Sequence, residues 1–75
     1  MKELIEIIAK AIVDQPEKVK VNEVEDENII TLELSVAQDD MGKVIGKQGR
    51  IAKAIRTVVR AAALNTEKKV VVEII

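Results

Sequence analysis

Val44-Ile45-Gly46-Lys47-Gln48-Gly49-Arg50-Ile51 is the stretch that decides the fold of this chain. Two glycines bracket two polar residues, and an aliphatic residue closes the stretch at each end. Glycine adopts backbone conformations that other residues avoid and has no Cβ, so the pair predicts a sharp turn that another backbone can approach closely. The turn would join a short helix over residues 41–45 to a longer helix that begins near residue 50.

The longer helix is predicted to have one apolar and one positively charged side. At about 100° per residue, apolar positions gather in one arc and basic positions in the opposite arc. The apolar arc holds Ile51, Ala54, Ile55, Val58, Val59 and Ala62, and the other arc holds Arg50, Lys53, Arg56, Thr57 and Arg60. We therefore expect a helix from residue 50 to about residue 65 that packs against a core.

Hydrophobic periodicity extends the prediction to the rest of the chain. A period near 3.6 over residues 2–14 predicts an amphipathic helix, which Asp14, Gln15 and Pro16 would end. Alternating patterns predict a short strand starting at residue 18 and strands over 29–37 and 68–75. Asp39 and Asp40 are placed to cap, or to favour electrostatically, the start of the short helix over 41–45. The order α-β-β-α-α-β predicts an α+β two-layer fold, with a three-stranded sheet and three helices on one face.

Composition excludes several classes of function. The chain has 75 residues, which suits one small domain, and it contains no cysteine and no histidine. Thiolate and imidazole metal sites and the common nucleophile–base pairs are therefore absent. The acidic residues over 23–27 are expected to be a solvated hairpin turn and not a metal site. With no aromatic residue, bases cannot stack on aromatic side chains. We expect a binding protein without enzymatic activity, cofactor or metal.

Charge is distributed unevenly along the chain. Residues 1–40 hold four lysines against eleven acids, whereas residues 41–75 hold eight basic residues against two acids. Residues 41–66 contain six basic residues and no acidic one. Solvated surfaces usually mix both signs, so this strip predicts a polyanion or an acidic protein as partner.

The glycine turn and the basic strip together predict a phosphate-binding site. Free backbone N–H groups at the start of the helix near Arg50, with the positive end of its dipole, favour an anion. Lys47 would add a mobile charge, and Arg50 could bind a phosphate with its planar fork. Lys43 and Lys53 would extend the positive strip by one helical turn on each side.

These residues and the order of the elements resemble the GXXG signature and type II fold of the K-homology (KH) domain, and the short chain resembles the KhpA family of bacterial RNA-binding proteins. The resemblance implies that residues 1–75 form a single KH domain that grips about four nucleotides of single-stranded RNA with low sequence selectivity. By this resemblance the RNA-binding residues are Lys43, Ile45, Gly46, Lys47, Gln48, Gly49, Arg50 and Lys53. Ile45, Ile55, Leu32 and Leu34 would form the aliphatic floor of the groove.

The resemblance also implies partners and a cellular role. KhpA proteins form homodimers and associate with a larger KH protein of the KhpB (Jag) type, and they act as RNA chaperones that affect growth and cell shape. Beyond Arg60 apolar residues wrap around the helix, so Val59, Ala62, Ala63 and Leu64 are candidate dimer contacts unless the last strand covers them. The N-terminus has no apolar signal segment, and we expect a cytoplasmic protein.

Two alternatives remain open. The basic helix could bind an acidic protein in a pure interaction or dimerisation module. Alternatively, residues 41–45 and the basic helix could form a helix-turn-helix that reads DNA. That first helix would be unusually short, and the basic face offers no Asn or Gln among its charged positions to read adenine.

Overall fold

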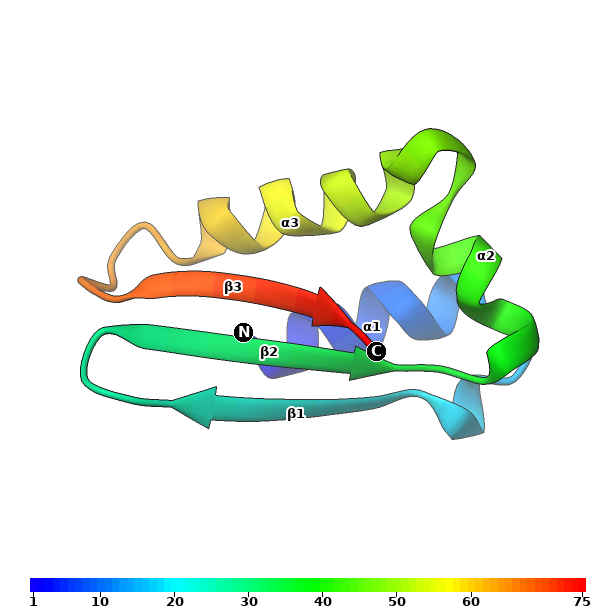
Figure 1. Ribbon diagram of the computed structural model, residues 1–75, viewed down its shortest axis with the longest axis horizontal. Coiled ribbons are helices and arrows are strands. Elements are labelled where there is room, and N and C mark those ends of the chain that lie inside the picture. Colours follow the sequence, from blue (N-terminus) through cyan, green and yellow to red (C-terminus); the bar gives the residue numbers. More distant parts are fainter.

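Three strands form a mixed sheet in which the spatial order equals the chain order, β1-β2-β3 (Figure 1). The computed structural model describes all residues from Met1 to Ile75. Strand β1 (Lys20–Glu25) pairs antiparallel with β2 (Ile29–Ser35), and β2 pairs parallel with β3 (Lys69–Ile74). A hairpin can join the first pair, whereas the parallel pair needs the long crossover that the helices after β2 supply.

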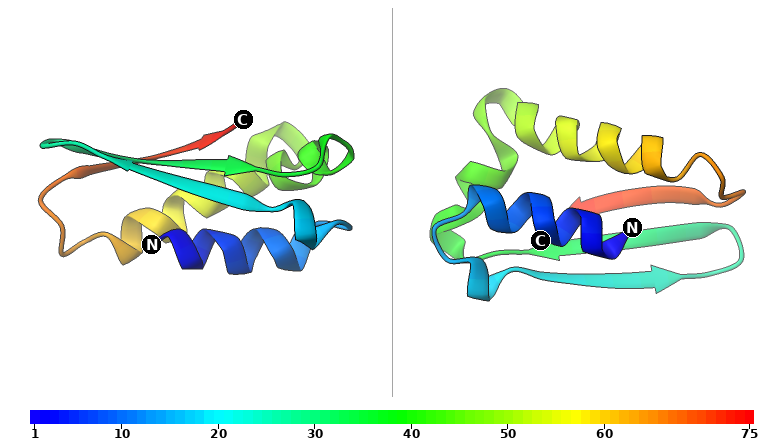
Figure 2. Two further views of the ribbon diagram at one scale, coloured as in Figure 1. Left: turned by 90° about the horizontal axis from the view of Figure 1, so that it is seen from below. Right: turned by 180° about the vertical axis from the view of Figure 1, so that it is seen from behind.

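The helices α1 (Lys2–Ile12) and α3 (Arg50–Ala62) lie side by side on one face of the sheet (Figure 2). The short helix α2 (Met41–Ile45) lies at the end of the sheet where β2 finishes (Figure 1). Three-residue 3-10 turns precede β1 (Pro16–Lys18), precede α2 (Gln38–Asp40) and join α2 to α3 (Lys47–Gly49). The predicted α-β-β-α-α-β order and the two-layer α+β class are confirmed.

The core lies between the helices and the inner face of the sheet. Ile30, Leu32 and Leu34 of β2 are buried, as their alternation with polar residues predicts. The helices contribute buried residues to this core: Ile5, Ala9, Val44, Ile55 and Val59. Val72 of β3, the register partner of Leu32, extends its sheet side. The core is thus wholly aliphatic, and the outer face of the sheet is left to solvent.

Some predicted boundaries were wrong by a few residues. Helix α1 ends at Ile12 because Val13 is extended, with φ −87° and ψ 159°. The first strand begins at Lys20 because Pro16 starts a 3-10 turn over the lysine expected in the strand. Helix α3 ends at Ala62 instead of near residue 65, since Leu64 lies beyond the core and is 83% exposed. A further helical turn after Ala62 would bury no apolar side chain, and so no packing would stabilise it.

The hairpin between β1 and β2 is held by one acid of the cluster over residues 23–27. The carboxylate of Asp26 accepts hydrogen bonds from the backbone N–H groups of Asn28 and Ile29, both at 2.7 Å. Such an Asx turn replaces the backbone bonds that the chain cannot make while it reverses. These two bonds lower the pKa of Asp26.

Helix α3 faces the core with a narrower arc than its apolar pattern predicts. Ala52, Ile55 and Val59 are buried, whereas Ala54 and Val58 are exposed. The helix contacts α1 on one side and β3 on the other, so only the arc between these neighbours is covered. Part of the apolar side of α3 consequently faces solvent.

Candidate nucleic-acid interface

The GXXG loop (residues 46–49) is a tight turn between α2 and α3, as predicted. Gly46, Gln48 and Gly49 have positive φ angles of 75°, 58° and 74°. Gln48 is the one residue other than glycine with positive φ, a conformation that costs free energy and that is enriched at ligand-binding sites. Lys47 and Gln48 are exposed at the tip of the loop.

The two glycines meet different demands. A Cβ at Gly46 would lie 2.6 Å from Cγ1 and 2.9 Å from the backbone nitrogen of Ile51, whereas a Cβ at Gly49 would meet nothing within 4 Å. The close neighbour of Gly46 is thus the first turn of α3, whereas within the protein Gly49 is required by its left-handed backbone. The space in front of Gly49 is open, so another backbone can approach it there.

The N-terminus of α3 is open and positively charged. No side chain caps it, and its first turn contains no acid. Arg50 donates a hydrogen bond from Nη2 to Oε1 of Gln48 at 3.4 Å, which holds its guanidinium near the loop. Arg50 and Lys53 are exposed in the first turn of α3, and Lys47 is exposed in the turn just before that helix. Free N–H groups, the helix dipole and these cations can together bind a phosphate.

A second positively charged feature, which we call the basic groove, runs between α3 and β3. It has a volume of about 200 Å³, with Arg56, Arg60 and Lys69 among the valines that line it. The half-buried Val70 and Val71 provide the accessible apolar lining, next to the core residues Val59 and Val72. Nε of Arg56 also donates a hydrogen bond to the backbone oxygen of Val72 at 3.4 Å. A groove with aliphatic walls and cationic edges suits bases on the inside and phosphates at the rim.

The basic groove was not predicted as a site, although its signal was partly present. Arg56 and Arg60 belong to the basic arc of α3, but only the pairing of strands places β3 beside them. The predicted groove floor was wrong in three positions, because Leu32, Leu34 and Ile55 are core residues that no ligand can reach. Ile45 is 39% exposed and keeps its place on the surface next to the loop.

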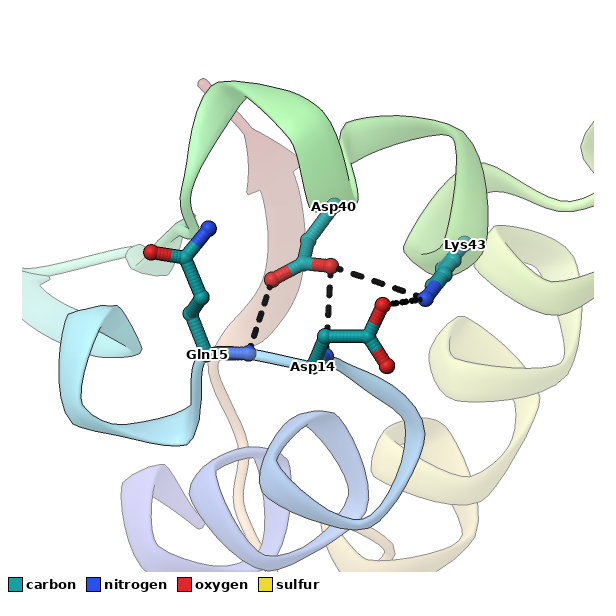
Figure 3. Close-up of polar contacts among 4 residues, drawn as sticks. All are labelled: Asp14, Gln15, Asp40 and Lys43. Carbon is teal, nitrogen blue, oxygen red and sulfur yellow. Dashed lines mark hydrogen bonds and ion pairs between the residues drawn. The ribbon is translucent and has the colours of Figure 1, made fainter.

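Lys43 was expected to extend the positive strip, but acids hold its ammonium group. The ammonium contacts Oδ2 of Asp14 and lies 3.9 Å from Oδ1 of Asp40 (Figure 3). The hydrogen bond to Asp14 and the two negative charges raise the pKa of Lys43. The cation therefore faces the segment after α1.

Asp40 stands at the N-cap position of α2, as predicted, but its side chain makes no capping hydrogen bond. No side chain caps that helix. Instead, the Asp40 carboxylate accepts hydrogen bonds from the backbone N–H groups of Asp14 at 3.2 Å and Gln15 at 3.1 Å (Figure 3). We call the cluster of Asp14, Asp40 and Lys43 the acid–lysine junction. Sequence spacing indicates only its local pair, Asp40 and Lys43, because Asp14 lies 26 and 29 residues away from them in the chain.

An apolar groove of about 370 Å³ lies between α1 and α3, with Ile8, Ile12, Ile51, Ala54 and Val58 among its lining residues. Of the candidate dimer contacts, Val59 is only 1% exposed and belongs to the core, so its assignment was wrong. Ala62 and Leu64 are exposed, and Ala63 is half-buried. Accessible apolar residues of α3 therefore line the groove next to α1, in addition to those at the C-terminal end of the helix.

Comparison with known proteins decides the family. The family described as "KhpA/KhpB, KH domain" matches residues 2–74 of this chain. The chain belongs to the KhpA/KhpB family of KH domains. The "RNA-binding protein KhpA" of Clostridium perfringens is 73% identical over 75 residues, and that of Clostridium acetobutylicum is 67% identical, with full coverage of both chains in each case. The KhpA of Borreliella burgdorferi is 51% identical over 73 residues, covering 97% of this chain and 89% of its own.

The resemblance of the sequence to the KhpA family is thereby confirmed, and the fold agrees with a small KH domain of this family. No solved structure matches the chain significantly. No helix in this KhpA/KhpB-family fold combines the length and the apolar character that a bilayer-spanning segment needs.

Proposed function

We propose that this protein binds single-stranded RNA, with the GXXG loop holding the phosphate backbone and the basic groove holding the adjacent bases. One observation carries the proposal: the glycine turn leads into the uncapped, acid-free start of α3, where Arg50 is exposed beside Lys47. The name of the similar proteins, "RNA-binding protein KhpA", supports RNA as the polyanion. The RNA-binding residues on this proposal are Ile45, Gly46, Lys47, Gln48, Gly49, Arg50 and Lys53, to which the groove adds Arg56, Arg60 and Lys69.

Low sequence selectivity follows from the chemistry of the groove. Its walls are valines, and the chain has no aromatic residue on which a base could stack. Contacts to phosphate give affinity without sequence information, so binding should depend strongly on salt. About four nucleotides would fit such a module. Family membership favours neither the helix-turn-helix nor the acidic-partner alternative.

The cellular role follows from the resemblance to KhpA. We infer a single KH domain over residues 1–75 that acts in the cytoplasm as an RNA chaperone, affects transcript fate and cell shape, and catalyses no reaction. The similar proteins are described as RNA-binding proteins and not as enzymes, which supports the inference that the protein catalyses no reaction.

A homodimer, or a complex with a larger KH protein of the KhpB (Jag) type, is the second part of the proposal. The apolar groove supports it, because Ile8 and Ile12 of α1 line it together with Val58 of α3, which is 42% exposed. Partly exposed aliphatic residues on two adjacent helices indicate a protein interface. Two linked RNA sites would raise affinity through effective concentration.

Fluorescence anisotropy with a short labelled single-stranded RNA tests the RNA proposal. The Lys47→Asp, Gln48→Asp double variant reverses the charge at the loop tip without touching either glycine. A matched control, Lys18→Asp with Gln38→Asp, makes the same changes at exposed residues outside the loop and α3. We expect the first variant to lose binding and the control to retain most of it, with both folded by circular dichroism. Equal binding by both variants would refute the loop as the phosphate site.

A further inference from the structure

We propose that Lys43 and Asp40 are positioning residues that hold the GXXG loop in its binding geometry, and that Lys43 does not bind phosphate. The inference rests on the proposed RNA-binding function and changes the role of one residue assigned to it from sequence.

Asp40 joins two segments that are distant in the sequence. Asp40 is 1% exposed, and its two carboxylate oxygens accept hydrogen bonds from the backbone N–H groups of Asp14 and Gln15. These N–H groups follow the end of α1, and because Val13 is extended they no longer point along the helix and need a partner elsewhere. The carboxylate thus fastens the end of α1 to the start of α2 (Figure 3).

Lys43 compensates the charge that this fastening buries. It stands one helical turn after Asp40 and reaches back to both Asp14 and Asp40. A buried carboxylate without a nearby cation is costly, so the ammonium stabilises the junction by its place between the two acids. A raised pKa of Lys43 agrees with this placement.

The junction matters for the loop because α2 is very short. A helix of five residues cannot sustain itself by its own hydrogen bonds, so contacts along it must fix its direction. Those contacts are the junction at its start, the buried Val44 in its middle, and Gly46 against Ile51 at its end. Releasing the first of them leaves α2, and hence the loop that continues it, less constrained.

A phosphate at Lys43 would compete with the contacts that the ammonium already makes. Binding an anion there would require the lysine to leave Asp14 and would remove the counter-charge from the buried Asp40. Lys47, in contrast, forms no ion pair and is exposed at the loop tip. The two lysines should therefore respond differently to salt when they are changed in the same way.

The test compares Lys43→Met with Lys47→Met by RNA titration across a salt series. Losing a phosphate contact reduces the slope of log affinity against log salt by about 0.7 for single strands. We expect Lys47→Met to reduce the slope by that amount, and Lys43→Met to lower affinity roughly three- to tenfold with the slope unchanged. An equal reduction of the slope by Lys43→Met, or no loss of affinity, would overturn the proposal.

A second readout does not require RNA. In amide NMR spectra of the free protein, Lys43→Met should shift or broaden the Gly46 and Gly49 signals, and Lys47→Met should leave the Asp14 and Gln15 signals in place. Unchanged loop signals in Lys43→Met would refute positioning even if the wild type failed to bind RNA. Failure of wild-type binding alone would refute the RNA proposal and not this one. Asp40→Asn, which keeps the shape and one acceptor, should disturb the same loop signals.

Discussion

The side chain of Ile51 occupies the space in front of Gly46, where a Cβ atom would lie 2.6 Å from Cγ1 of Ile51. The contact closes the angle between α2 and α3 and leaves the two polar residues of the GXXG loop at the outside. Gly49 has a similar φ angle, 74° against 75°, but has open space around it. Two glycines that look equivalent in the sequence therefore carry different constraints.

Alanine at each glycine should reveal this difference. Gly49→Ala places a Cβ in the left-handed region, which costs roughly 1–2 kcal/mol of unfolding free energy. Gly46→Ala adds a clash with Ile51, and overpacking costs about 1–3 kcal/mol. Its backbone, with φ 75° and ψ 175°, also lies in a region that is essentially restricted to glycine, so its strain is at least as large. Urea unfolding followed by circular dichroism measures both. Equal losses at the two positions would contradict the close contact.

Gly42 provides the control for the two loop glycines. It lies inside α2 without a positive φ, and a Cβ there would meet nothing within 4 Å. Replacing such a glycine by alanine should raise the unfolding free energy by about 0.5–1 kcal/mol. The same unfolding experiment should then rank the variants with Gly42→Ala above the wild type and Gly46→Ala lowest.

Local patterns in the sequence predicted the elements because each pattern has a local physical cause. The alternation in β2 and the glycine pair need only neighbouring residues to be recognised, and both were correct. The acid–lysine junction could not be found in this way, because it joins Asp14 to residues far along the chain. The orientation of α3 also depends on its neighbours, since α1 and β3 decide that Val59 is buried while Val58 is exposed.

The Asx turn at Asp26 predicts a specific dependence of stability on pH. Its hydrogen bonds from Asn28 and Ile29 lower the pKa of the folded state below the ordinary value of 3.8. The stabilisation is therefore complete above pH 3.8 and is lost as the pH falls through the lower folded-state pKa. Asp26→Asn should unfold at lower urea than the wild type at pH 6, and the difference should shrink below pH 3.8. A difference independent of pH would show that the charge of Asp26 is not involved.

Two acids face each other on the outer side of the sheet. Glu33 and Glu73 are register partners in the parallel pair β2 and β3, and only Glu33 has a polar partner, the amide of Asn22 at 3.0 Å. Like charges on adjacent strands destabilise a sheet by a few tenths to about 1 kcal/mol. Glu73→Lys should therefore raise the melting temperature at low salt, and much less in 1 M salt. Glu67→Lys, the same charge change at an exposed residue outside the sheet, should raise it less.

The apolar groove and the end of α3 offer different predictions for self-association. Val58 is 42% exposed in the groove, whereas Leu64 is 83% exposed beyond the last turn of the helix. If two copies associate through the groove, Val58→Glu would bury a charge in the interface, and it should weaken association at least tenfold because an unpaired buried charge is strongly unfavourable. Leu64→Glu should change it little. Sedimentation velocity over a range of concentrations distinguishes the outcomes, and dissociation by Leu64→Glu alone would place the contact at the helix end, where the sequence first indicated it.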